Sequence, residues 1–306
     1  MHLILGSPHD LCCVSVQAAL EARGCSTRLV SNPVAHPSRF SWRLTNDEST
    51  SQLVWEDGTS VFEDKIDGVF VRRAVWIDPD GWQNEDLGYM QSETHAAVLG
   101  WLWSLPCPVV NRYSAAMWYH SQPHPLSWQR QLRRCGLPTP ETLVTNVDEE
   151  SRAFGKQLSR EGVPGVVYGP LTRDSRYLIT DNKDWDGLAA MQRHAPVCLT
   201  YPHEAVQFVC VVGQQAIWEG EPPLEPIELE PALHSFAAAL GLTFVELAFA
   251  RTAQGICVVG VEPHPYIDHF GYRAQQQIVD GLVDLLTAGA GRNYNSAAHA
   301  FERSCL

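Results

Sequence analysis

The sequence has few lysines and little positive charge overall. Only three lysines occur in 306 residues, at Lys65, Lys156 and Lys183, and the formal net charge is −13. Nucleic acids and anionic membranes are bound by basic surfaces, which this composition does not provide. We therefore expect no nucleic-acid partner and no membrane partner.

Long apolar runs and paired cysteines are also missing. The longest apolar stretch, 96–110, is interrupted by Ser104 and two prolines and is too short to span a bilayer. The nine cysteines are scattered without a Cys-x-x-Cys pair, which is typical of free thiols in a reducing compartment. The first residues lack the basic region of a signal peptide. These features predict a cytoplasmic protein.

The sequence begins with a β–α–β pattern. Residues 2–6 form an apolar run, Asp10 stands at the N-cap of a helix that Gly24 ends, and 25–30 form a second apolar run. Such a unit implies a parallel sheet. Towards the C-terminus, apolar and alternating runs indicate an antiparallel sheet instead; they cover 206–212, 214–218, 243–249 and 256–262.

The order of these elements predicts a mixed fold in which an α/β part is followed by α+β parts. We expect an N-terminal parallel α/β lobe over 1–118, a small central α+β lobe over 119–200, and a C-terminal α+β lobe over 201–288. Residues 289–306 are rich in glycine, alanine and asparagine, which favours a loose tail.

Five short strings carry a family resemblance through their order and spacing. They lie at 69–73 (VFVRR), 108–111 (PVVN), 136–146 (GLPTPETLVTN), 166–171 (VVYGPL) and 262–265 (EPHP). With them the chain resembles the ATP-grasp superfamily, and within it the peptide-modifying carboxylate–amine ligases of the graspetide-maturing and ribosomal-protein glutamate ligase types.

This resemblance implies an ATP-grasp fold and a reaction in which ATP phosphorylates a carboxylate that an amine or hydroxyl then attacks. It further implies two lysines and an arginine against the triphosphate, with Mg²⁺ held by an acidic residue and a Glu-x-Asn pair. It makes Arg72 and Arg73 candidate substrate contacts, and it makes ATP and Mg²⁺ the cofactors to look for.

The positions that would supply positive charge carry neutral residues. The first lysine of the family falls on Pro125, beside His124, and the second falls on Gly169. The arginine falls on Phe208, and no arginine lies between Arg193 and Arg251. Each missing charge removes a few kcal/mol of transition-state stabilisation. Phosphoryl transfer by the family's ordinary route is therefore not expected.

The metal-binding positions also differ. The aspartate of the family falls on Phe249, or on Ala248 with a one-residue gap. Glu262 is retained, and His264 replaces the asparagine, although imidazole is a poor ligand for Mg²⁺. Glu246 lies two residues before Ala248 and shares its side of a strand. Glu246, Glu262 and His264 are therefore candidate metal ligands, against the simpler interpretation that they make ordinary hydrogen bonds.

Other basic residues could replace the missing charges. Arg173, Arg176 and Lys183 flank the turn after Leu171, and Arg173 and Arg176 are candidate nucleotide contacts. The simpler interpretation is that all three are solvated turn charges. The histidines, His269 among them, lack any His-x₃-His or His-Glu-x-x-His spacing, which favours surface or capping roles.

The sequence supports two main hypotheses. In the first, the chain is a pseudoenzyme or binding homologue of the ligases and acts on a peptide or beside a catalytic partner protein. The aromatic residues of 101–128 favour packing in the core and between lobes over a partner or peptide surface, and a homodimer is plausible. In the second, it is an active ATP-dependent ligase with a rewired site. A third, weaker hypothesis is a different chemistry in the same cleft without nucleotide.

Overall fold

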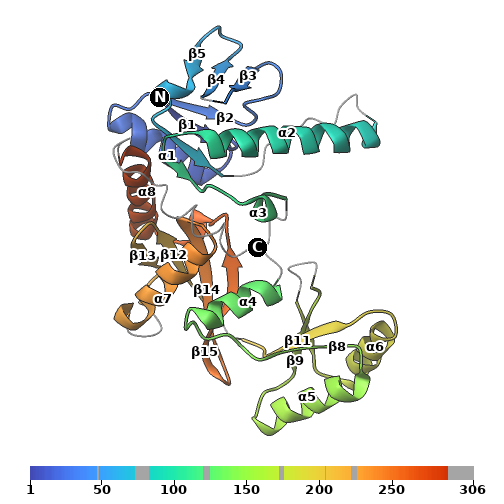
Figure 1. Cartoon of the computed structure of the whole chain (residues 1–306). Coiled ribbons are helices and arrows are strands. Elements are labelled where there is room, and N and C mark those ends of the chain that lie inside the picture. The colour runs from blue at the N-terminus through green and yellow to red at the C-terminus, as the bar shows by residue number, and fades with distance from the viewer. Residues whose placement is uncertain are drawn as a thin grey trace.

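The computed structural model describes residues 1–46, 48–72, 83–119, 125–171, 176–203, 205–221 and 226–288. Within these residues the chain forms three four-stranded sheets and one three-stranded sheet, each covered by helices or packed on a neighbouring element (Figure 1). Arg73, Arg173 and the tail at 289–306 lie outside the described residues. None of the described helices combines the length and the apolar character needed to cross a membrane.

The N-terminal lobe is built on a parallel sheet of order β2-β1-β6-β7. Its strands are β1 (His2–Leu5), β2 (Thr27–Val30), β6 (Gly68–Val71) and β7 (Val109–Val110). The first crossover helix, α1 (Leu11–Ala22), starts where the Asp10 carboxylate accepts from the backbone N–H groups of Cys12 and Cys13. The long helix α2 (Asn84–Ser104) and the short α3 (Ala115–Tyr119) complete the lobe. All four residues of β1 and of β6 are buried, as a parallel sheet covered on both faces requires.

An antiparallel sheet of three strands is inserted between β2 and β6. It comprises β3 (Arg39–Leu44), β4 (Ser49–Val54) and β5 (Ser60–Phe62), followed by the 3₁₀ turn η1 (Glu63–Lys65). Its turn at Trp55–Thr59 is closed by the Trp55 N–H, which donates to the Thr59 carbonyl at 2.9 Å. Trp42 packs against Gly100 of α2, where a side chain would come within 3.2 Å of the indole.

The central lobe is an antiparallel sheet of order β10-β9-β11-β8 with two helices on one face. Its strands are β8 (Thr142–Thr145), β9 (Val166–Gly169), β10 (Tyr177–Ile179) and β11 (Val197–Thr200). Helices α5 (Asp148–Arg160) and α6 (Asn182–Gln192) bury Phe154, Leu158 and Leu188 against this sheet in a core of their own. In Figure 1 the lobe projects from the rest of the molecule beside β15.

The C-terminal lobe has an antiparallel sheet of order β13-β12-β14-β15. The strands are β12 (Val206–Val212), β13 (Gln215–Trp218), β14 (Phe244–Thr252) and β15 (Gly255–Glu262). Helix α7 (Pro226–Ala239) packs on one face, with α4 (Pro125–Arg134) beside it. The other face meets the 3₁₀ turn η2 (Ile267–His269) and α8 (Tyr272–Thr287), and α8 also packs on α1 of the N-terminal lobe.

The fully buried Asn111, directly after β7, joins the N-terminal lobe to β14. Its amide nitrogen donates to the Phe244 carbonyl at 2.6 Å. Its amide oxygen accepts from the backbone N–H groups of Thr243 at 2.9 Å and Phe244 at 2.8 Å. One side chain therefore satisfies three backbone groups that water cannot reach.

The structure confirms the mixed fold class, with a parallel sheet followed by antiparallel sheets. An asparagine that follows a strand and precedes a helix is a usual N-cap, so the sequence predicts that Asn146 caps the helix up to about Arg160; in the structure it does not cap α5. The N-cap residue is Val147, and Thr145 supplies the polar contacts: its hydroxyl accepts from the Val147 N–H at 3.0 Å and donates to Glu150 at 2.6 Å.

Replacing Asn111 by alanine should destabilise the protein by about 3 kcal/mol, because buried backbone groups of Thr243 and Phe244 would lose their partner. Urea denaturation of Asn111→Ala, compared with the exposed helix residue change Asn182→Ala, measures the difference. A loss for Asn111→Ala no larger than that for Asn182→Ala would contradict this role.

Candidate functional site

Two rows of side chains lie side by side on one face of the C-terminal sheet. The strand register places Phe208, Ala248 and Gly260 opposite one another in the first row. It places Cys210, Glu246 and Glu262 opposite one another in the second row. Ala248 therefore shares the face of Glu246, whereas Phe249 is buried in the core on the other face.

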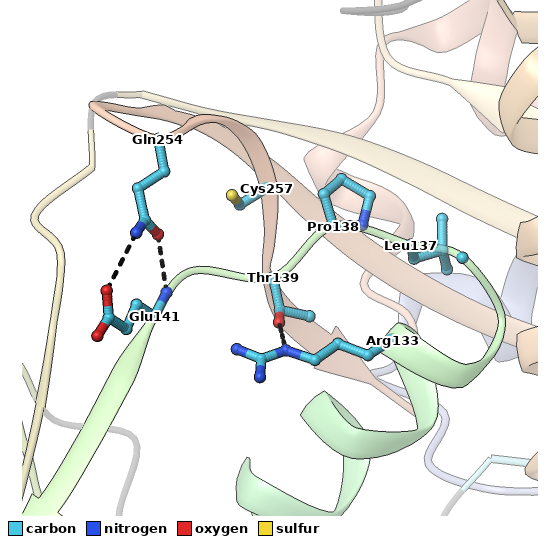
Figure 2. Close-up of a pocket in the computed structure, with 8 residues that line it drawn as sticks. Arg133, Leu137, Pro138, Thr139, Glu141, Gln254 and Cys257 are labelled. Carbon is cyan, nitrogen blue, oxygen red and sulfur yellow. Dashed lines mark hydrogen bonds between the residues drawn. The ribbon is translucent and has the colours of Figure 1, made fainter.

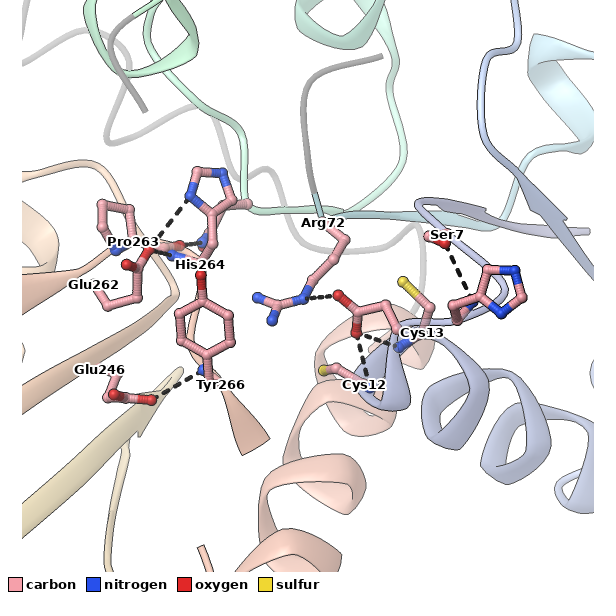
Figure 3. Close-up of polar contacts among 12 residues, drawn as sticks. Ser7, Cys12, Cys13, Arg72, Glu246, Glu262, Pro263, His264 and Tyr266 are labelled. Atoms are coloured by element: carbon pink, nitrogen blue, oxygen red, sulfur yellow. Dashed lines mark hydrogen bonds and ion pairs between the residues drawn. The ribbon is translucent and has the colours of Figure 1, made fainter. Parts of the chain in front are cut away.

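Glu246 is a buried carboxylate with two hydrogen-bond donors. Its side chain is 4% exposed, and it accepts from the Tyr266 N–H at 3.0 Å (Figure 3). Its other oxygen lies 2.9 Å from Nδ1 of His269. Burial raises the pKa of Glu246, while the contact with His269 acts in the opposite direction. A buried carboxylate needs such partners, because an unpaired one would be strongly destabilising.

Glu262 pairs with His264 rather than with Glu246. Its Oε1 accepts from the backbone N–H of His264 at 2.8 Å and lies 3.6 Å from Nδ1 of the same residue. The His264 ring stacks on Tyr113, with centroids 4.8 Å apart, and the Tyr113 hydroxyl donates to the Pro263 carbonyl at 3.1 Å. The ring of His264 is thereby held by the N-terminal lobe.

The three candidate metal ligands thus have separate partners: Glu246 contacts His269, and Glu262 contacts His264. Glu246 and Glu262 are directly opposite each other across β14 and β15, and His264 follows at the end of β15. In the part of the chain that the structure describes, no group of three or more His, Cys, Asp or Glu side chains is arranged to hold a metal ion. A metal at Glu246, Glu262 and His264 stays a prediction from sequence.

The strand positions on the face of the central sheet opposite α5 and α6 carry no charged side chain, although Arg176, just before β10, lies close enough to Cys198 on this face to influence the pKa of its thiol. Val166, Ile179, Val197 and Leu199 point into the core beneath the helices, so the alternate residues form the other face. Those residues are Leu178, Val167, Thr200 and Thr142 in one row and Gly169, Cys198 and Val144 in the next. None of these seven side chains is basic, and Gly169 has none that could replace a lysine.

Arg176 is the basic residue that connects this lobe to the C-terminal sheet. Its Nη2 donates to the Val259 carbonyl of β15 at 2.7 Å, and its Nη1 lies 2.9 Å from Nε2 of His203. Arg176 therefore faces the C-terminal lobe, as a nucleotide contact between the two lobes would have to do. The other candidate, Arg173, lies outside the described residues, and Pro125, the position of the first lysine, begins α4.

Arg72 lies at the end of β6 and is 3% exposed. Its Nε donates to Asp10 at 2.9 Å, and Asp10 at the same time caps α1 through the N–H groups of Cys12 and Cys13 (Figure 3). The guanidinium also lies 5.8 Å from the ring centre of Tyr266, and its buried Nη1 has no hydrogen-bond partner within the part of the chain that the structure describes. Burial raises the pKa of the Cys12 thiol, so Cys12 is a core residue and not an activated nucleophile.

A separate pocket of about 460 Å³ lies where the chain passes from α4 to β8 (Figure 2). Arg133 and Glu141 stand at its wall; the Arg133 Nε donates to Thr139 at 2.7 Å, and the Glu141 N–H donates to Gln254 at 2.9 Å. The lining consists of Arg133, Gly136, Leu137, Pro138, Thr139, Glu141, Gln254 and Cys257. It contains neither Glu246 nor Glu262.

The sequence alone missed His269, which the structure places on Glu246. The histidine pattern favoured a surface or capping role, since partners 23 residues apart give no spacing signal. The His269 ring also stacks on Phe208, with centroids 4.4 Å apart, and no pattern in the sequence indicated this contact.

Comparison with solved structures finds close matches over nearly the whole chain. The macrocyclase MdnC from Microcystis aeruginosa MRC, bound with precursor peptide MdnA, is 16% identical, with 94% of this chain and 99% of that chain covered and a TM-score of 0.72. The ATP-grasp ligase PsnB, complexed with minimal precursor, Mg and ADP, is 20% identical over 95% and 98%, with a TM-score of 0.71. A RimK domain protein from Sphaerobacter thermophilus is 19% identical over 93% and 98%, with a TM-score of 0.55.

The chain has the ATP-grasp fold. These likenesses confirm the resemblance at the level of fold, for the peptide-modifying ligases and for the RimK type alike. No protein-family model matches the sequence, and no curated protein matches it significantly. The fold alone therefore does not establish an activity for this chain.

Replacing Arg72 by methionine should destabilise the fold by about 2 kcal/mol, because Asp10 would keep its charge at a mostly buried position without its cation. Urea denaturation measures the effect. The matched control is Arg23→Met, since Arg23 pairs with Asp284 at 2.6 Å on the surface and should contribute under about 1 kcal/mol. Equal losses in the two variants would refute the structural importance of the Arg72–Asp10 pair.

Proposed function

We propose that this protein is a binding homologue of the peptide-modifying ATP-grasp ligases and does not use ATP by their ordinary route. Its ligand in this proposal is a peptide or a catalytic partner protein. The observation that carries the proposal is the charge of the two facing sheets: the strand positions named above contribute two carboxylates, Glu246 and Glu262, and no cation.

The charges of the strand residues support the proposal that the chain does not use ATP by the ordinary route. A nucleotide triphosphate brings several negative charges into the cleft, and ligases of this fold offset them with cations and Mg²⁺. Here the strand position of the arginine is Phe208, which stacks on His269, and that of the second lysine is Gly169. Glu246 and Glu262 would repel the phosphates instead of attracting them.

The peptide part of the proposal rests on the neighbours in fold. MdnC was crystallised with its precursor peptide MdnA, and PsnB was crystallised with a minimal precursor. The likeness to MdnC covers 94% of this chain, and this shared fold supports a peptide-binding surface here. A chain that lost its phosphate contacts could keep a peptide-binding role.

A direct test is titration calorimetry with ATP and Mg²⁺. The wild-type protein should bind more weakly than about 1 mM, and Gly169→Lys should strengthen binding roughly tenfold, because one charge-assisted hydrogen bond contributes about 1.5 kcal/mol. Gly187→Lys on the exposed side of α6 is the matched control and should leave binding unchanged. Micromolar affinity of the wild type would overturn the proposal.

A second candidate is an active ligase with a rewired site, and the position of Arg176 favours it. Arg176 reaches β15 at Val259, three residues before Glu262, so one cation and two opposed carboxylates border the same cleft. In this proposal Arg176 contacts a phosphate and Glu262 holds Mg²⁺, since carboxylate oxygens suit this ion. The solved structure of PsnB contains ADP and Mg.

The two candidates differ in ADP release. If the chain is a ligase, a pool of synthetic peptides rich in aspartate and glutamate should stimulate ADP release from ATP, and Glu262→Gln should reduce that release at least a hundredfold. Lys156→Gln in the exposed part of α5 serves as the control and should have no effect. If no peptide in the pool stimulates ADP release, the chain is not a ligase that acts on acidic peptides.

A further inference from the structure

The pocket between α4 and β8 is used neither by the family resemblance nor by the proposed function. Its volume of about 460 Å³ lies within the range of small-molecule pockets, which is roughly 300 to 1,000 Å³. Two of its lining residues, Arg133 of α4 and Glu141 just before β8, carry opposite charges (Figure 2). The pocket contains none of the candidate metal ligands, so it is a separate place in the fold at which a ligand could bind.

Arg133 and Glu141 do not form an ion pair with each other or with another described residue. The Arg133 Nε donates to the Thr139 hydroxyl at 2.7 Å, and its Nη2 donates to the Pro140 carbonyl at 3.4 Å. Within the described residues this leaves the two N–H groups of Nη1 for a ligand. On Glu141, Oε2 accepts from the Gln254 amide at 3.4 Å, and Oε1 has no hydrogen-bond partner among the described residues. Each charge is therefore open to a ligand of the opposite sign.

Hydrogen bonds from three places hold the chain segment that lines the pocket. The Val258 N–H of β15 donates to the Pro138 carbonyl at 2.8 Å, and the Thr200 hydroxyl of β11 donates to the Glu141 carbonyl at 3.0 Å. The Glu141 N–H donates at 2.9 Å to the side chain of Gln254, in the turn between β14 and β15. Because this backbone is already fixed, a ligand would not have to order it on binding.

Leu137, Pro138 and Cys257 form an apolar wall of the pocket. Leu137 is 1% exposed, Cys257 is 3% exposed, and Pro138 is half-buried. Burial raises the pKa of the Cys257 thiol, while the charge of Arg133 acts in the opposite direction, so the thiol stays neutral and the arginine lies near this wall. An apolar group placed here is removed from water, whereas a charged group would find no partner on the wall.

We propose that this pocket binds the zwitterion of a free α-amino acid with an apolar side chain. The Arg133 guanidinium contacts the carboxylate, and the Thr139 hydroxyl, which accepts from Arg133, donates its own proton to the same group. Oε1 of Glu141 accepts from the ammonium group, and the side chain of the amino acid lies against the apolar wall. A zwitterion fits because it supplies both charges that the pocket leaves unpaired. The inference does not depend on whether the chain binds ATP.

The test is a ligand-observed NMR titration of the full chain with L-leucine as the probe. Two analogues each remove one charge: isocaproate is leucine without its ammonium group, and isoamylamine is leucine without its carboxylate. L-leucine should approach saturation below about 10 mM. Each analogue should bind roughly tenfold more weakly, because it loses a charge-assisted hydrogen bond and leaves one charge of the pocket without a partner.

Substitutions assign each charge of the ligand to one residue. Arg133→Gln should weaken the binding of L-leucine roughly tenfold without weakening that of isoamylamine, which has no carboxylate to contact. Glu141→Gln should likewise weaken the binding of L-leucine without weakening that of isocaproate. The matched controls are Arg134→Gln on the same helix and Glu149→Gln on α5, both exposed and outside the pocket lining, and they should bind L-leucine as the wild type does.

Three results would overturn the inference. The first is no binding of L-leucine to the wild type at about 10 mM. The second is binding of isocaproate and isoamylamine as tight as that of L-leucine, which would remove the need for a zwitterion. The third is binding to folded Arg133→Gln and Glu141→Gln as tight as to the two controls, which would place the amino acid elsewhere. Circular dichroism shows whether the variants are folded, and the three ligands on the wild type decide the charge requirement without any variant.

Discussion

A polyphosphate is held only where positive charge offsets its own, and this requirement constrains every functional reading of the chain. The two sheets that border the cleft of the fold present neutral residues and two carboxylates at the strand positions that face it. Arg176 is a cation at the edge of β15, and it already donates to the Val259 carbonyl. The fold alone does not establish a ligase, because one scaffold can carry different activities and the activity depends on the residues of the site.

The buried polar groups are organised around β14. Asn111 ties the start of this strand to the N-terminal lobe, and two positions further along Glu246 receives donors from the Tyr266 backbone and from His269. A buried polar group in a dry interior is stable only when its partners are complete, so these contacts fix the loop after β15 as well as the strand. Glu262 and His264 therefore lie at the contact with the N-terminal lobe, where His264 stacks on Tyr113, whereas the His269 ring beside Glu246 is partly exposed.

Local patterns in the sequence were sufficient for the fold class. Period-two and continuous apolar runs predicted β12 to β15, and the Asp10 cap predicted the start of α1. The turn at Trp55–Thr59 has the residues of a hairpin turn and joins β4 to β5. Strand β3 was not predicted, because it alternates half-buried with exposed residues and lacks a strong apolar signal. Asn146 was wrong as a cap because Thr145 already supplies the polar contacts of that turn.

The site was less predictable than the fold, since its contacts join residues far apart in the chain. That Glu246 and Ala248 share a face followed from strand periodicity, but the choice of His269 as partner depends on where η2 returns over the sheet. Phe208 illustrates the point: as a replacement for an arginine it signals a lost charge, whereas in the structure its ring supports an imidazole. An aromatic ring at that position carries no positive charge, and here its face packs against the imidazole of His269, so the structural role of the residue could not be inferred from the charge pattern alone.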